Sequence, residues 1–284
     1  FGWVSYTEGD RPYFHCSAAH FRFAGKCNCC AKIKWMAKRA LVLSGGGIFG
    51  AWQAGAWSVL ARQFQPDLIV GTSVGSLNGY AIAAGCSHEE MLELWRRPQA
   101  AGFKKLPETI RELVEARPLH MDFAAVLVNL LRMREETFTN QAVTWRHLVA
   151  SCAVPLLMRP VRIDGNWYLD GGLLHALPLA AALALDATEI LALNVLAEFP
   201  EPALQPLVLA FRTVMSKAVV IPANVKVATL VPRKRLGNLK GASIWNAANV
   251  EKWYAQGIED ASSAFDGGQL AFLQNISTGD CLGP

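Results

Sequence analysis

Two short apolar runs, each entering a glycine turn and then a helical pattern, constrain the fold of this chain most. The first run, 39–43, leads through a run of glycines into a helix expected over 51–63. The second, 68–70, leads through Gly71 into a helix expected over about 74–84. Strand, turn and helix in repetition predict an α/β fold, with a mainly parallel central sheet and helices on both faces.

Further elements follow the same alternation. A helix is expected from Ser87, because acidic residues lie in its first turn and basic residues in its last. A tight turn between 160–163 and 167–169 predicts a hairpin. A strand is expected over 190–195, and the helical pattern over 243–265 predicts a helix that packs on the sheet.

Composition narrows the class of protein. The 284 residues are 52% hydrophobic and 18% charged, enough for one large core. Residues 1–39 hold seven Lys and Arg, so the remaining chain carries 20 basic and 21 acidic residues and is nearly neutral. Nucleic-acid binding requires a basic face within the fold, so no nucleic-acid partner is expected. The longest apolar stretch, 178–197, is interrupted by charged residues too early to span a membrane.

The first 37 residues differ from the rest. They show neither alternation nor helical period, and they hold His15, Cys16, His20, Cys27, Cys29 and Cys30. A metal site is one interpretation, but this spacing matches no zinc pattern. We expect residues 1–37 to be an extension, disordered or foreign to the natural protein, and residues 38–284 to be the functional domain.

Three other cysteines are far apart in the sequence. Cys86, Cys152 and Cys281 are better explained as buried or free thiols than as a disulfide framework. This favours a reducing compartment. Because the long apolar stretch of a secretory signal is also missing, we expect a cytoplasmic location.

The G-T-S-V-G motif at 71–75 predicts a nucleophile. Its two glycines allow a sharp turn between a strand and a helix, so Ser73 is expected at the apex in a strained backbone conformation, with its oxygen at the start of the helix. The motif alone is short and arises by chance, but its position between a predicted strand and a predicted helix strengthens it. The alternative is a structural turn whose serine only caps the next helix.

The glycine-rich loop S-G-G-G-I-F-G at 44–50 has two functional interpretations. A nucleotide-binding loop requires an acid at the far end of the next strand, whereas Asp67 precedes that strand. An oxyanion hole requires backbone amides near the nucleophile, and Gly45, Gly46 and Gly47 follow a strand whose end shares an edge with that of Ser73. The second interpretation is favoured, and a purely structural glycine turn stays open.

A serine nucleophile also needs a base. Asp170 ends a predicted strand and is followed by two glycines that let the backbone turn close to another loop. An ordinary Asp-Gly turn is the alternative. No histidine has a context that marks it as catalytic, although His175 after Asp170 leaves a Ser, Asp, His triad open.

These three motifs, in this order, resemble those of the bacterial patatin-like phospholipases, a family of lipid acyl hydrolases. The similarity covers roughly residues 38–197 and includes A-S-C-A-V-P at 150–155. The resemblance implies a patatin-like three-layer α/β/α fold, a Ser73 and Asp170 dyad without histidine, oxyanion donors at the three loop glycines, and no cofactor or metal. It also implies extended chain over 126–140, where the residue pattern of 123–132 by itself predicts a helix.

One position departs from the family pattern. Phe49 stands where the family loop usually has Arg or Lys, which favours neutral or simple acyl esters over phospholipid head groups. We therefore expect a serine acyl-ester hydrolase of the lipase, esterase or phospholipase A type, with a lipid or acyl-ester substrate. A nucleotide-binding protein and a non-catalytic fatty-acyl-binding module are the alternatives. Transient contact with a membrane surface stays open, and nothing in the sequence indicates the oligomeric state.

Overall fold

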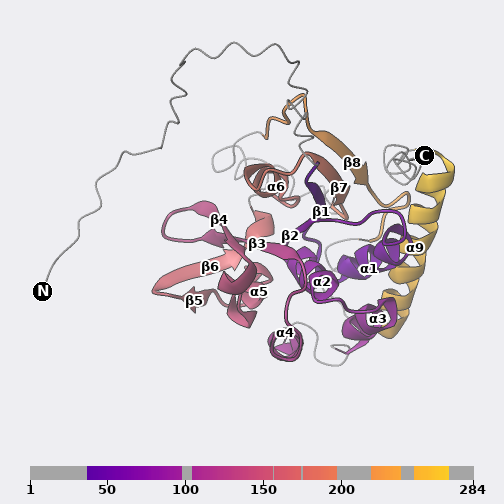
Figure 1. Ribbon diagram of the computed structural model, residues 1–284. Helices are drawn as coiled ribbons and strands as arrows, with labels where there is room; N and C mark the ends of the chain where they lie inside the picture. Colours follow the sequence, from indigo (N-terminus) through magenta and orange to yellow (C-terminus); the bar gives the residue numbers. More distant parts are fainter. Residues whose placement is uncertain are drawn as a thin grey trace, which may run out of the picture. The chain divides into compact units, whose positions relative to one another are not determined.

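A computed structural model shows the architecture of the chain (Figure 1). The described residues are 37–97, 104–155, 157–173, 175–196, 219–237 and 246–268. The expected extension up to residue 36, its candidate metal ligands and Cys281 lie outside these ranges. Cys86 and Cys152 are free thiols, as expected.

The described strands form one mixed sheet in the order β5-β6-β3-β2-β1-β7-β8, with β4 paired to β3. The strands are β1 (Arg39–Leu43), β2 (Leu68–Thr72), β3 (Asp122–Asn129), β4 (Arg134–Thr139), β5 (Val161–Ile163), β6 (Asn166–Asp170), β7 (Glu189–Leu193) and β8 (Lys226–Leu230). The pairs β1–β2, β1–β7, β2–β3 and β7–β8 are parallel. The pairs β3–β4, β3–β6 and β5–β6 are antiparallel. The expected mainly parallel central sheet is confirmed.

Helices cover the sheet. The α-helices are α1 (Gly50–Leu60), α2 (Val74–Ala83), α3 (His88–Arg96), α4 (Leu106–Ala116), α5 (Trp145–Ser151), α6 (Leu179–Ala184) and α9 (Ala247–Asp266). Short 3-10 turns occur at η1 (Gly47–Phe49), η3 (Asn140–Ala142) and η4 (Gly171–Leu173). Ser87 begins α3 with a capping box to Glu90, which explains why this helix could be predicted from its first residues. None of the described helices is long and apolar enough to cross a membrane.

The sheet separates two hydrophobic cores. Leu41 and Leu43 of β1 point into the larger core, which also contains side chains of α1, α2 and α9. Ala40 and Val42 point to the opposite face, where α6 packs. Because successive strand residues face opposite sides, a strand covered on both faces is apolar throughout. This explains the short unbroken apolar runs in the sequence.

The C-terminal helix α9 packs on α1 rather than directly on the sheet as expected. A Cβ at Gly55 would collide with the Tyr254 carbonyl, and one at Gly257 would collide with the Trp52 carbonyl. The indole Nε1 of Trp52 donates to Asp260 Oδ2 at 2.8 Å within this contact. The two helix backbones therefore approach closely through their glycines, and α1 lies between α9 and the sheet.

Residues 123–132 do not form the helix that their apolar spacing predicts. Phe123 to Asn129 belong to β3 and are buried throughout. A strand buried on both faces has apolar residues at every position, so its pattern also satisfies a helical period. The extended chain over 126–140 implied by the family resemblance is confirmed for β3 and β4. The hairpin β5–β6 is also confirmed, with Asp164 (φ 46°) and Gly165 (φ 81°) in the left-handed region that such a turn requires.

Candidate active site

Two strands meet end to end along one edge of β3 and bring the two predicted catalytic residues together. Thr72 at the end of β2 pairs with Val126, and Asp170 at the end of β6 pairs with Leu127, the next residue of β3. Since β2 is parallel and β6 antiparallel to β3, the two strands run toward each other. Ser73, which follows Thr72, therefore lies directly against Asp170.

The turn at Ser73 has the strained geometry of a nucleophile elbow. Ser73 has φ 53° and ψ −134°, values that L-residues rarely adopt. Gly71 and Gly75 are required here, because a Cβ at Gly71 would collide with the Gly75 carbonyl and one at Gly75 with backbone carbonyls at the end of β1. The serine precedes α2, yet its side chain makes no capping hydrogen bond to that helix. The geometry therefore does not support a simple helix-capping role for Ser73.

The hydroxyl of Ser73 contacts the carboxyl of Asp170. Ser73 Oγ donates to Asp170 Oδ2 at 2.6 Å, and the Gly172 amide donates to Oδ1 at 2.7 Å. Both side chains are almost fully buried. Burial raises the pKa of the Asp170 carboxyl from 3.8 to about 7, although the hydrogen bonds from Ser73 and Gly172 act to lower it. A carboxylate with a pKa near neutrality is a stronger base than an ordinary aspartate.

Gly171 explains why a glycine follows Asp170. A Cβ at this position would collide with Thr72 Oγ1 and with the Val126 carbonyl. Only a residue without a side chain lets the end of β6 pass this close to the end of β2. The D-G-G motif is therefore more than an ordinary surface turn in this fold.

The glycine loop lies beside the nucleophile. A Cβ at Gly45 would lie 3.1 Å from Ser73 Cβ. The Gly45 amide donates to the Ala176 carbonyl at 2.8 Å. Among the described residues, the amides of Gly46 and Gly47 have no hydrogen-bond acceptor. Within the described part of the chain, the Gly45 amide is therefore engaged by a backbone carbonyl, whereas those of Gly46 and Gly47 are not.

The loop is anchored by a buried polar network. Gln53 Nε2 donates to the Ser44 carbonyl at 2.8 Å, and Asn78 Nδ2 donates to Gln53 Oε1 at 3.0 Å. Asn78 Nδ2 also donates to the Gly50 carbonyl at 2.8 Å, while Trp95 Nε1 donates to Asn78 Oδ1 at 2.8 Å. The network connects both ends of the loop to α1, α2 and α3. It fixes the loop rigidly next to Ser73.

Comparison with known proteins identifies the family. The family model for patatin-like phospholipase matches residues 41–121 and 103–183, which together make up half of the chain. The chain belongs to the patatin-like phospholipase family. The matched residues include the glycine loop, the elbow and the D-G-G motif.

Individual proteins are similar to this chain over part of their length. Patatin-like phospholipase domain-containing protein 7 of Mus musculus is 26% identical over 182 residues, covering 55% of this chain and 13% of its own length. Lysophospholipase NTE1 of Mycosarcoma maydis is 28% identical over 183 residues, covering 55% of this chain and 9% of its own length. This patatin-like chain thus spans a small part of these relatives. Among solved structures, VipD from Legionella pneumophila superposes with a TM-score of 0.49 at 12% identity, covering 81% of this chain and 67% of that one.

The position that departs from the patatin-like loop pattern belongs to the core. Phe49 is buried, and its ring packs edge-on against Trp253 of α9 at 4.9 Å between centroids. The aromatic side chain therefore joins the end of the glycine loop to α9. It supplies no charge to the site.

Two serines that the sequence did not single out hold the patatin-like elbow in place. The Ser73 amide donates to Ser151 Oγ at 2.9 Å, and Ser151 Oγ donates to the Val126 carbonyl at 2.9 Å. Ser76 Oγ donates to the Ser73 carbonyl at 2.6 Å. Ser151 belongs to the A-S-C-A-V-P stretch, which was the only available signal for its role. Both backbone groups of the strained nucleophile are thus fixed by side chains.

The histidine considered for a triad has another partner. His175 Nδ1 lies 2.9 Å from Glu135 Oε1. The hydroxyl of Ser73 donates its hydrogen bond to the carboxylate of Asp170. Within the described residues, no three His, Cys, Asp or Glu side chains gather as they would around a metal ion.

Proposed function

We propose that this chain is a serine acyl-ester hydrolase of the lipase, esterase or phospholipase A type, and that residues 38–284 form its catalytic domain. The observation that carries the proposal is the 2.6 Å hydrogen bond from Ser73 Oγ to Asp170 Oδ2 at a strained strand-to-helix turn. Family membership supports a lipid or acyl-ester substrate.

Acylation is the first step. Asp170, ionised, accepts the hydroxyl proton as Ser73 Oγ bonds to the carbonyl carbon of the ester. The carbonyl oxygen becomes negative and accepts hydrogen bonds from the loop amides of Gly46 and Gly47. The tetrahedral intermediate then collapses, the bond to the alcohol breaks, and protonated Asp170 gives its proton to the departing alkoxide. An acyl-Ser73 ester remains.

Deacylation repeats these steps with water. Asp170 accepts a proton from water as the water oxygen attacks the acyl carbon, and Ser73 recovers the proton when the carboxylic acid leaves. Removal of one oxyanion donor typically slows such reactions by about 100- to 1,000-fold, comparable with the contribution of a general base. An ordinary aspartate is a weak base for a serine hydroxyl. The raised pKa of Asp170 and the proposed oxyanion hole together compensate for this weakness.

The decisive experiment measures hydrolysis of nitrophenyl esters of graded chain length. Ser73→Ala and Asp170→Asn are expected to lose at least about 1,000-fold in kcat/KM. Asp186→Asn, which changes an exposed carboxylate, is the matched control and should keep full activity. A fluorophosphonate probe with mass spectrometry should place the covalent adduct on Ser73. Full activity of Ser73→Ala would disprove the proposal.

The same proteins separate the alternatives. A nucleotide-binding protein would show a nucleotide-dependent thermal shift that survives Ser73→Ala. A non-catalytic acyl-binding module would bind fatty acid and release none from an ester. Adduct formation at Ser73 together with turnover would exclude both.

A further inference from the structure

The sheet continues beyond the proposed catalytic dyad and ends in two neighbouring turns. Past Val126, the partner of β2's last residue, β3 pairs with β6 and β4 (Figure 1). The Leu130 amide donates to the Trp167 carbonyl at 2.9 Å and joins the β3–β4 turn to the start of β6. Trp167 precedes Asp170 by three residues, so this tip lies about 10 Å from the dyad along the strand.

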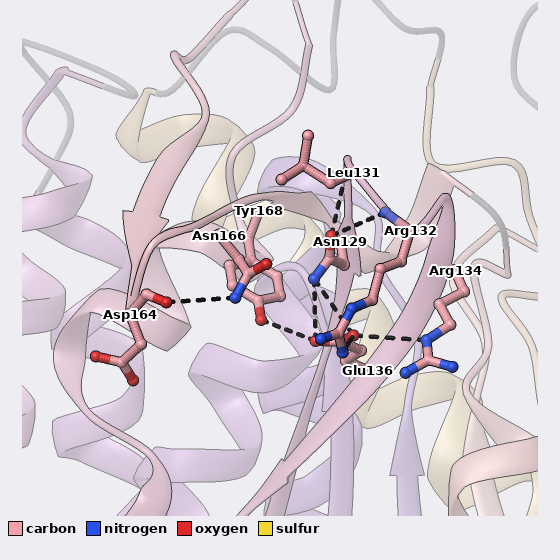
Figure 2. Close-up of polar contacts among 8 residues, drawn as sticks. All are labelled: Asn129, Leu131, Arg132, Arg134, Glu136, Asp164, Asn166 and Tyr168. Carbon is pink, nitrogen blue, oxygen red and sulfur yellow. Dashed lines mark hydrogen bonds and ion pairs between the residues drawn. The ribbon is translucent and has the colours of Figure 1, made fainter.

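The β3–β4 turn is held rigidly by polar side chains. Asn129 Oδ1 accepts hydrogen bonds from the amides of Leu131 and Arg132 at 3.0 and 3.1 Å (Figure 2). Glu136 accepts from Tyr168 Oη at 2.8 Å, and its Oε1 pairs with Arg132 at 3.0 Å. Partial burial raises the pKa of Glu136, but hydrogen bonds from Tyr168, Asn129 and Arg132 outweigh it and hold the pKa below its ordinary value. The carboxylate is therefore charged at neutral pH and fixes the turn.

This turn and the neighbouring start of β6 expose apolar side chains. Leu131 is 70% exposed, and Figure 2 shows it pointing away from Glu136. Met133 is 39% exposed and Trp167 43% exposed. Met133 also has φ 50°, a conformation that costs energy for a residue with a side chain. The strained turn therefore holds apolar side chains in solvent, where they add little to the packing of the hydrophobic core.

Arginines surround these apolar groups. Arg132 and Arg134 flank Met133 in the turn, and their side chains are 55% and 64% exposed. Arg162 lies opposite Trp167 across β5–β6 and is also exposed. Glu136 pairs with both Arg132 and Arg134, at 3.0 and 3.5 Å, and Glu135 pairs with His175; both carboxylates are partly buried, whereas Asp164 is exposed. We define the hairpin tip as Leu131, Arg132, Met133, Arg134, Arg162 and Trp167.

We propose that the hairpin tip docks on the surface of a bilayer that contains anionic lipid. Leucine, methionine and tryptophan side chains enter the head-group region, where tryptophan is favoured, while arginines bind lipid phosphates through bidentate hydrogen bonds. Glu135, Glu136 and Asp164 balance the three arginines in number, but the arginines are exposed whereas Glu135 and Glu136 are partly buried, so the exposed guanidinium groups complement an anionic surface. Docking itself requires no catalytic reaction. Its functional consequence, bringing the dyad close to lipid, rests on the proposed function.

The test is co-sedimentation with vesicles, performed in a Ser73→Ala background so that no hydrolysis is involved. The parent is expected to bind phosphatidylglycerol-containing vesicles at least about tenfold more tightly than pure phosphatidylcholine vesicles, with binding that weakens in high salt. Leu131→Asp and Trp167→Ser should each weaken binding by about tenfold. Arg132→Gln with Arg134→Gln should weaken it by about 25-fold, because each arginine contributes about fivefold.

Matched controls use other exposed sites. Ile258→Ser on α9 changes a similarly exposed apolar residue, and Lys234→Gln changes a charge in the separate basic stretch 233–235. Both should bind as the parent does. Thermal melting shows whether each variant is folded.

Three results would overturn the proposal. They are no binding to any vesicle, equal binding to anionic and neutral vesicles, and unchanged binding of the tip variants. The first would favour a protein partner at the tip. None of them depends on ester hydrolysis, so failure of the docking proposal and failure of the proposed function remain distinguishable.

Discussion

The buried carboxyl of Asp170 predicts a specific dependence of both stability and activity on pH. Its pKa is raised from 3.8 to about 7 by burial, so the folded protein binds a proton that the unfolded chain releases above about pH 4. The protonated form is therefore favoured by folding. Asp170 contributes stability that is fully present below about pH 4 and is lost as pH rises through about 7.

The magnitude follows from the size of the pKa change. A rise from 3.8 to about 7 corresponds to about 4 kcal/mol between acidic and alkaline conditions. Asp170→Asn removes the titrating group and keeps the shape of the side chain. The free energy of unfolding of the variant relative to wild type should therefore increase by up to about 4 kcal/mol between about pH 4 and about pH 8, then stay constant.

Urea unfolding from about pH 4 to about pH 9 measures this difference directly. Asp186→Asn, an exposed carboxylate, serves as the control and should show no comparable change. In parallel, kcat/KM of wild type should rise with pH to a plateau with a midpoint near 7, because the base must be ionised. A stability difference that is flat across this range would refute the inference that burial controls Asp170.

Two further substitutions test the elbow. Ser151→Ala leaves the buried Ser73 amide without its partner, while the Val126 carbonyl keeps a hydrogen bond from Thr72 Oγ1. The substitution should lower the free energy of unfolding by about 2 kcal/mol and kcat by up to about a hundredfold, measured by urea unfolding and ester hydrolysis. An unchanged kcat would show that the hydroxyl does not position the nucleophile. Gly75→Ala places a Cβ against carbonyls at the end of β1 and should destabilise by about 3 kcal/mol, seen calorimetrically as a Tm about 6–12 °C lower. A Tm within a degree or two of wild type would contradict the close approach.

Local geometry made part of this protein predictable from its residues. Gly71 is required by the turn at 71–75 itself, because a Cβ there would collide with the Gly75 carbonyl. The start of α3 requires its capping serine, and the β5–β6 turn requires residues that tolerate positive φ. These features depend on neighbours within a few residues. The order of strands and helices, and the candidate dyad of Ser73 and Asp170, followed from them together with the family resemblance.

The spacing of apolar residues did not distinguish a strand from a helix where both faces of the element are buried. Residues 123–129 are apolar on both faces, and so the sequence period could not separate strand from helix. The family resemblance corrected this interpretation. Similarly, the helical pattern near the C-terminus predicted α9, but its partner is α1, because glycines on the two helices permit a close contact that no single segment specifies.

The sequence, read together with its family resemblance, therefore determined the turns, the order of elements and the candidate nucleophile and base, since these depend mainly on motifs over short stretches. Only the tertiary structure decided how they work together. Ser73 and Asp170 are 97 residues apart and meet because β2 and β6 end against adjacent residues of β3. The raised pKa of Asp170, the support from Ser151 and the bond that engages Gly45 all arise from contacts between distant segments. Desolvation and hydrogen bonding depend on the distances between atoms in space, and the folded chain alone sets those distances.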